Sequence, residues 1–271
     1  MIDDINILAD YLGPRDLPAL TPAALVEKYG IPQADAFVLF SGSILPGGDI
    51  FAAAKKAEIA KKYIIVGGHG HTTDGLRAQA KAVFPDLEVD SLSEAEILAA
   101  YVQRKYQITA DLLECQSTNS GNNIIYLLDR LNRHNIDLSS VILCQDATMQ
   151  LSLSAVLRKY RPELTIINYA AYQVHVLGKD GQLAYDKEIP GMWPMDRYIS
   201  LLMGEIPRLR DNKDGYGPLG KDYIAHVDLP AAVEEAFARL RKEYGGSVRQ
   251  ANPAYKSEFE LKNGRRRRDF C

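Results

Sequence analysis

The chain has 271 residues, of which 46% are hydrophobic and 25% are charged, and its formal net charge is −3 at pH 7. These values are typical of a globular protein with one large α/β domain, and they give no electrostatic reason to expect a nucleic acid as the partner. The first residues carry acids instead of a basic signal region, and no apolar run approaches the roughly 18 residues that span a bilayer, so we expect a cytoplasmic protein without a membrane anchor.

Residues 1 to 34 are expected to form N-terminal helices in front of an α/β core at residues 35 to 170. Two apolar runs, AFVLF (36 to 40) and YIIV (63 to 66), are each followed by a short segment with glycine, as buried parallel strands often are. The intervening segment FAAAKKAEIAKK (51 to 62) is rich in helix formers. Strand, helix and strand within about thirty residues predict a βαβ unit.

The same alternation continues along the core. A helix is predicted from about Ser93, a strand near Leu112 and a helix at residues 120 to 133. The strands VILC and LTII follow, at 141 to 144 and 164 to 167, with a helical pattern between them. This alternation predicts a doubly wound, mostly parallel sheet of the Rossmann-like class.

Beyond about residue 170 the alternation stops, and glycine and proline become frequent. Pro194 suits the first turn of a helix, and DGYGPLG (214 to 220) predicts a long loop. We therefore expect a helical and loop elaboration at residues 171 to 245, packed on the core. Four successive arginines lie in the remaining tail, residues 246 to 271, for which a solvated and mobile segment is favoured over a site for an acidic surface.

Four short polar segments follow the predicted strands. They are SGSILPGGD (41 to 49), GGHGHTTDG (67 to 75), ECQSTNSGNN (114 to 123) and QDATMQ (145 to 150). In an open parallel sheet, ligands bind outside the carboxyl ends of the strands, where these segments meet. The sequence therefore predicts one pocket for a small metabolite at this edge.

Helix capping is the simplest role for the small polar residues of ECQSTNSGNN, because Ser, Thr and Asn are the preferred caps. One cap needs one such residue, whereas residues 117 to 120 are all of this type and Asn122 and Asn123 follow. The surplus indicates that this junction also hydrogen-bonds a ligand.

Known nucleotide-binding motifs are absent. Gly42 and Gly47 have P-loop spacing, but Gly48 and Asp49 stand where Lys and Ser or Thr are required. Neither glycine-rich segment contains GxGxxG, so a conventional NAD enzyme is disfavoured.

His69 and His71 could bind a metal with Asp74 or Asp146 as a third ligand. The chain has five histidines and no HExxH motif, so no metal is assigned. For His71, hydrogen bonding in the crevice is the favoured role.

The segment ECQSTNSGNN resembles the E-x-x-S-x-N-T-x-E-N signature of the YdcF/SanA/ElyC family, Rossmann-like proteins long described only as a domain of unknown function. The matching positions are Glu114, Ser117, Asn119 and Asn123. Ser120 replaces Thr, and Asn122 replaces Glu, which removes a carboxylate from the crevice. The segments GGHGHTT, QDATMQ, GMWPMDRY and residues 204 to 230 are most similar to the YdcF branch, and the resemblance covers about residues 35 to 245.

The resemblance implies binding of an adenosyl ligand, with S-adenosylmethionine favoured, and it implies no established reaction. Asn and Ser can hydrogen-bond a ribose or an amino-acid head, and glycines permit close approach of the backbone. The predicted ligand-binding residues are Gly42, Ser43, Gly67, Gly68, His71, Thr72, Glu94, Glu114, Ser117, Asn119, Asn123 and Asp146.

The C-terminal elaboration is expected to supply a second wall of the pocket through aromatic and basic residues. The candidates are Trp193, Arg208, Arg210 and Tyr216. For Trp193, anchoring of the extra helices to the core is favoured over this role, and the arginines could instead pair with Asp211 and Asp214.

Three functions are compatible with these residues. The first is an adenosyl-ligand binder, which would be a transferase if a second substrate meets the pocket. The second is a metal-assisted hydrolase of phosphoesters or diphosphates that uses His71 and Asp146 to activate water. The third is a ligand sensor without turnover.

Overall fold

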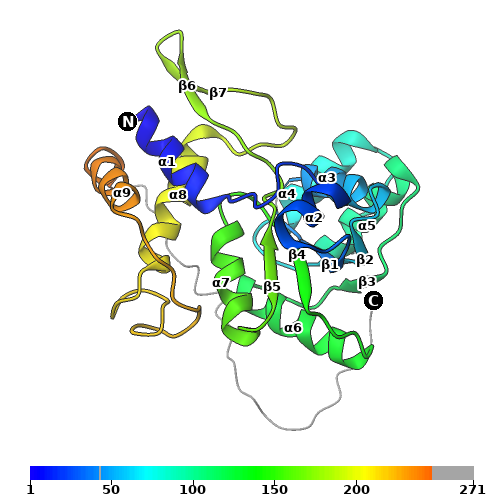
Figure 1. The fold of residues 1–271 in the computed structure, drawn as a ribbon. Coiled ribbons are helices and arrows are strands. Elements are labelled where there is room, and N and C mark those ends of the chain that lie inside the picture. Colours follow the sequence, from blue (N-terminus) through cyan, green and yellow to red (C-terminus); the bar gives the residue numbers. More distant parts are fainter. Residues whose placement is uncertain (43, 246–271) are drawn as a thin grey trace.

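The computed structural model describes residues 1–42 and 44–245. Ser43, one of the predicted ligand contacts, and the predicted tail at residues 246–271 lie outside the described residues. A five-stranded sheet in the order β3-β2-β1-β4-β5 occupies the centre of the fold (Figure 1). Its neighbouring strands all pair in parallel. The protein therefore has the α/β, Rossmann-like fold that the alternating sequence pattern predicts.

The strands lie where the apolar runs predict them. Their bounds are β1 Ala34–Phe40, β2 Ala60–Val66, β3 Leu112–Glu114, β4 Ser140–Cys144 and β5 Thr165–Asn168. β4 is buried at every position, and β1 at all but one. Strands covered on both faces need continuous apolar sequence, which explains the runs AFVLF and VILC.

Helices cover both faces of this sheet (Figure 1). They are α3 Pro46–Lys56, α4 Thr73–Val83, α5 Glu94–Tyr106, α6 Ser120–Arg133 and α7 Gln150–Tyr160. α3 packs against α5, and α6 packs against α7. This arrangement follows from right-handed crossovers that run outward from β1 to β3 and then return to β4 and β5.

One predicted helix boundary was wrong. The helix-forming segment at residues 51 to 62 is helical only to Lys56, and Lys61 and Lys62 belong to β2. Both lysines are exposed at the start of that strand, where Lys61 forms an ion pair with Asp35. Helix propensity is a weak local preference, and here the strand pairing of β2 with β1 overrides it.

The C-terminal elaboration contains a β-hairpin that the sequence analysis missed. β6 Val176–Lys179 and β7 Gln182–Tyr185 pair antiparallel, and Asp180 and Gly181 between them both have positive φ. Asp-Gly at a two-residue turn is a strong hairpin signal, so this element was predictable.

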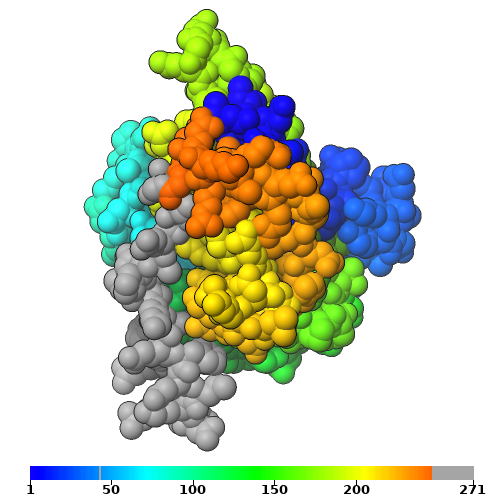
Figure 2. Space-filling view, turned by 90° about the vertical axis from the view of Figure 1, so that its left-hand side faces the viewer, coloured from blue at the N-terminus to red at the C-terminus, as the bar shows by residue number. Residues whose placement is uncertain are grey.

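The two ends of the described chain lie together. α1 Ile2–Leu12 packs against α8 Met195–Leu209 and α9 Ala231–Tyr244, and Figure 2 shows α1 in blue beside α9 in orange. Asp4 of α1 accepts hydrogen bonds from Arg239 of α9. α2 Pro22–Tyr29 completes the N-terminal helices.

Across residues 1–42 and 44–245, no helix combines the length and apolarity needed to cross a membrane.

Candidate functional site

A cavity lies at the carboxyl edge of the sheet, where β1, β2, β3 and β4 end. Most of its lining comes from the segments that follow these strands, at residues 41–42, 68–72, 117–120 and 145–149. Its empty space, counted together with its open mouth, is about 670 Å³. The chain order reverses between β1 and β4, and such a switch point is where open α/β sheets bind their ligands.

Most of the predicted ligand-binding residues meet in this cavity. Those that line it are Gly42, Gly68, His71, Thr72, Glu94, Ser117, Asn119, Asn123 and Asp146. Gly67 and Glu114 lie next to the lining but are not part of it. The lining also contains residues outside the predicted ligand-binding set, namely Ser41, His69, Gly70, Thr118, Ser120, Gln145, Thr148, Met149 and Leu201.

The segments after β2 and β3 are held together by Gly68 and Ser117. The Gly68 backbone N–H donates to Ser117 Oγ at 3.1 Å, and the His69 N–H donates to the Ser117 carbonyl at 3.0 Å. A Cβ atom on Gly68 would lie 2.0 Å from that carbonyl oxygen, so only glycine fits there. Ser117 therefore shapes the cavity as well as lining it.

Glu114 supports the same segment from behind. Its Oε1 accepts from the backbone N–H groups of Gln116 and Ser117, at 2.6 and 3.0 Å. Its Oε2 is buried without a partner among the described residues. Burial raises the pKa of Glu114, although the hydrogen bonds from Ser117 and Gln116 oppose part of this change. Glu114 thus holds the loop after β3 in shape and lies outside the cavity lining, so its predicted ligand contact stays a prediction.

At the start of α6, Asn119 and Asn123 both line the cavity, but only Asn119 caps the helix. Asn119 is the N-cap, and its Oδ1 accepts from the Asn122 N–H at 2.9 Å. Asn122 Nδ2 donates to Thr118 at 3.3 Å. The Asn123 side chain also lines the cavity, and no residue in the described part of the chain hydrogen-bonds to its amide. The Asn123 amide is therefore available to a ligand.

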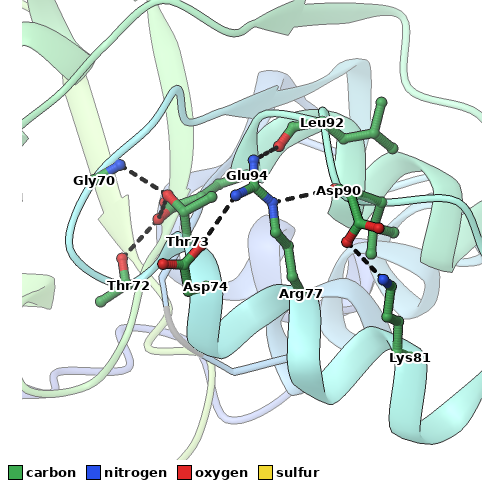
Figure 3. Close-up of polar contacts among 10 residues, drawn as sticks. Gly70, Thr72, Thr73, Asp74, Arg77, Lys81, Asp90, Leu92 and Glu94 are labelled. Carbon is green, nitrogen blue, oxygen red and sulfur yellow. Dashed lines mark hydrogen bonds and ion pairs between the residues drawn. The ribbon is translucent and has the colours of Figure 1, made fainter.

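Glu94, at the start of α5, is a buried carboxyl group of the cavity lining. Figure 3 shows its contacts with two threonines. The residue is 7% exposed, and its Oε1 accepts from the Thr72 and Thr73 hydroxyls at 2.7 and 2.9 Å. Burial raises the pKa of Glu94, and the two threonine donors offset part of this rise. Its Oε2 makes no hydrogen bond within residues 1–42 and 44–245. A buried carboxyl with one open oxygen is suited to accept from a ligand hydroxyl or ammonium.

Arg77 of α4 braces the segment that leads to Glu94 (Figure 3). Its guanidinium donates to the Val89 and Leu92 carbonyls and pairs with Asp74. Asp74, a candidate metal ligand in the sequence, is thus an exposed partner of this arginine. The brace fixes where α5 begins, and with it the position of Glu94.

Asp146 lines the cavity, but its oxygens already accept from protein groups. Oδ1 accepts from Thr148 and from the Tyr172 hydroxyl, and Oδ2 accepts from the Trp193 indole at 3.0 Å. The Asp146 residue is 6% exposed. Asp146 therefore lies in the cavity as predicted, with most of its hydrogen-bonding capacity used by protein donors.

The second wall consists of Trp193, which precedes α8, and Leu201 within α8. The other candidates for this wall lie elsewhere. Arg208 pairs with Glu205 and Arg210 pairs with Glu234, so the partners in the structure differ from the predicted Asp211 and Asp214. The Tyr216 ring contacts the Tyr223 ring edge-on at 5.3 Å between centroids. Leu201 had no signal in the sequence, because its position depends on how α8 packs against the sheet edge.

The charge of the lining restricts which ligands the cavity could bind. Within the described residues, the lining contains Glu94, Asp146 and two histidines but no lysine or arginine. Likewise, in this part of the chain no group of three His, Cys, Asp or Glu side chains is arranged to hold a metal ion.

A search with profiles of known protein families finds no match for this chain.

Proposed function

We propose that this protein binds a small adenosyl metabolite, with S-adenosylmethionine as the first candidate, in the cavity at the carboxyl edge of the sheet. The observation that carries the proposal is the meeting of Glu94 and Asn123, each with unused hydrogen-bonding atoms, at the switch point of the sheet. The resemblance to the YdcF/SanA/ElyC family supplies the adenosyl class.

The polar groups of the cavity match the parts of such a ligand. Glu94 Oε2 can accept from ribose hydroxyls or from an ammonium group, and the Asn123 amide can both donate and accept. The N-terminus of α6 lies at the cavity and favours a carboxylate. Trp193 and Met149 offer apolar surface for a base.

The absence of lysine and arginine from the described lining argues against ligands with several phosphates. Phosphate groups usually need a cationic side chain or a metal ion to offset their charge. Two carboxyl groups in the lining would instead repel them. A nucleoside derivative therefore fits better than a nucleotide.

Calorimetric titration tests the proposal. S-adenosylmethionine should bind with one site per chain, and ATP should bind more weakly. Asn123→Ala should weaken binding, because it removes an amide that has no structural partner. Asn132→Ala is the matched control, since Asn132 is an exposed asparagine near the other end of the same helix. Equal affinities in the two variants would contradict the site.

An assay for turnover distinguishes a transferase from a ligand sensor. A transferase would convert bound S-adenosylmethionine when a second substrate is supplied, whereas a sensor would release it unchanged. The hydrolase alternative is tested by phosphoester assays with and without a chelator, and the occupied oxygens of Asp146 give it no support.

A further inference from the structure

The hydrogen bond between Asp146 and Trp193 joins the sheet edge to the C-terminal elaboration. The two residues are 47 positions apart in the chain, and the indole Nε1 donates to Asp146 Oδ2 at 3.0 Å. The other oxygen of Asp146 accepts from the Thr148 N–H at 2.9 Å, from the Thr148 hydroxyl at 2.8 Å and from the Tyr172 hydroxyl at 2.8 Å. Burial, and then the charge of Asp146, raise the pKa of Tyr172, so its hydroxyl stays a donor.

Trp193 is also held at its backbone. Its carbonyl accepts from the Tyr185 hydroxyl at 3.0 Å, and burial raises the pKa of Tyr185 so that this hydroxyl keeps its proton. Pro194 follows and restricts the backbone of Trp193 to extended conformations. The Arg197 guanidinium lies over the indole, 5.9 Å from the ring centroid. The orientation of the ring is therefore fixed from several sides, while part of its surface lines the cavity.

We propose that Asp146 is a positioning residue of the ligand site, which holds the Trp193 indole in place as the C-terminal wall of the cavity. A buried carboxylate whose oxygens accept four hydrogen bonds from the protein fixes the geometry of its donors, because charge-assisted hydrogen bonds are short and strong. The same bonds leave Asp146 with little capacity for a ligand. The expected effect of Asp146 on ligand affinity rests on the proposed function, whereas its effect on the orientation of the Trp193 indole does not.

Fluorescence of the free protein tests the positioning directly, because Trp193 is the single tryptophan of the chain. In Asp146→Ala, the emission maximum should move to longer wavelength and quenching by acrylamide should increase. Asp146→Asn should restore part of the wild-type spectrum, since its amide oxygen can still accept from the indole. Asp196→Ala, at an exposed aspartate in the first turn of α8, should leave the spectrum unchanged.

Unchanged emission and quenching in Asp146→Ala would overturn the inference. If this variant does not fold, Asp146→Asn decides, because its amide replaces one accepting oxygen by a donor and so loses at least one of the four hydrogen bonds. Emission and quenching of Asp146→Asn identical to the wild type would then overturn the inference, and a smaller shift to longer wavelength would support it.

A double-mutant cycle with S-adenosylmethionine tests the effect on affinity. Asp146→Ala and Trp193→Leu should each weaken binding about tenfold, the size expected for loss of one base–aromatic contact. The double variant should also lose about tenfold, because both changes remove the same contact. A loss near a hundredfold would show that Asp146 touches the ligand directly and would overturn the inference. If the wild type binds no adenosyl compound, the proposed function fails, and the fluorescence alone decides the role of Asp146.

Discussion

The open oxygen of Glu94 predicts how ligand binding depends on charge. In Glu94→Gln, the amide oxygen can still accept from Thr72 and Thr73, but an NH2 donor replaces Oε2, which makes no hydrogen bond to the described residues. The variant therefore loses one charge-assisted hydrogen bond, which is worth about 1.5–3 kcal/mol. Affinity for S-adenosylmethionine should fall roughly 10- to 150-fold.

The pH dependence gives the same prediction a second test. Burial raises the pKa of Glu94 in the folded protein, and a ligand that donates to its carboxylate requires the ionised form. Wild-type affinity should therefore weaken as the pH falls through this pKa, by up to about tenfold per pH unit well below it. Glu94→Gln should lack that dependence. Calorimetry between about pH 5 and about pH 8 measures both effects, and Glu88→Gln, an exposed glutamate, is the control.

As the pH rises through the pKa of Glu94, ligand affinity should increase, whereas the contribution of Glu94 to the stability of the free protein should decrease. A raised pKa means that the stability contributed by protonated Glu94 is present below the unfolded pKa and is lost as the pH rises through the folded pKa. Glutamine cannot ionise, so the melting temperature of Glu94→Gln relative to the wild type should increase with pH. Wild-type affinity in this variant, or a relative melting temperature that falls with pH, would refute the reasoning.

Three further predictions concern the cavity loops and the core. Gly68→Ala should destabilise the fold by at least about 1–3 kcal/mol in urea, because its Cβ would overlap the Ser117 carbonyl; wild-type stability would show that this contact is misplaced. Asn119→Ala should cost about 1 kcal/mol through loss of the helix cap, and Asn119→Asp should retain most of the stability; equal losses in both would exclude capping. Burial raises the pKa of Cys144 to about 12, so peptide mapping should find it alkylated by iodoacetamide only after unfolding, and labelling of the folded protein would contradict its burial.

Much of the fold followed from local sequence. Strands buried on both faces must be continuously apolar, so β1 and β4 stood out as short apolar runs. The predicted helix at residues 120 to 133 matches α6, whose apolar residues recur at helical spacing and whose start is marked by Asn119. The start of β2 was misassigned because two exposed lysines there suit a helix as well as a strand.

The place of the cavity was predictable because parallel strands direct all their carboxyl ends to one edge. Which of its side chains cap a helix, hold a loop or stay open to a ligand could not be predicted from the sequence. Asn119 and Asn123 look alike in the sequence, and only the helix geometry makes one a cap and leaves the other open. The sequence placed Asp146 at the cavity but did not reveal its protein donors, of which Tyr172 and Trp193 come from 26 and 47 residues further along the chain. Contacts over such separations depend on the packing of whole elements, which local patterns do not encode.

Hydrogen–deuterium exchange with and without saturating S-adenosylmethionine tests the central claim most directly, because it reports where the ligand binds. Ligand should slow exchange in the segments at residues 67–72, 117–123 and 145–149, while α2, which lies outside the cavity lining, should exchange as before. Unchanged exchange in all three segments, or protection confined to other elements, would contradict a ligand site at the carboxyl edge of the sheet.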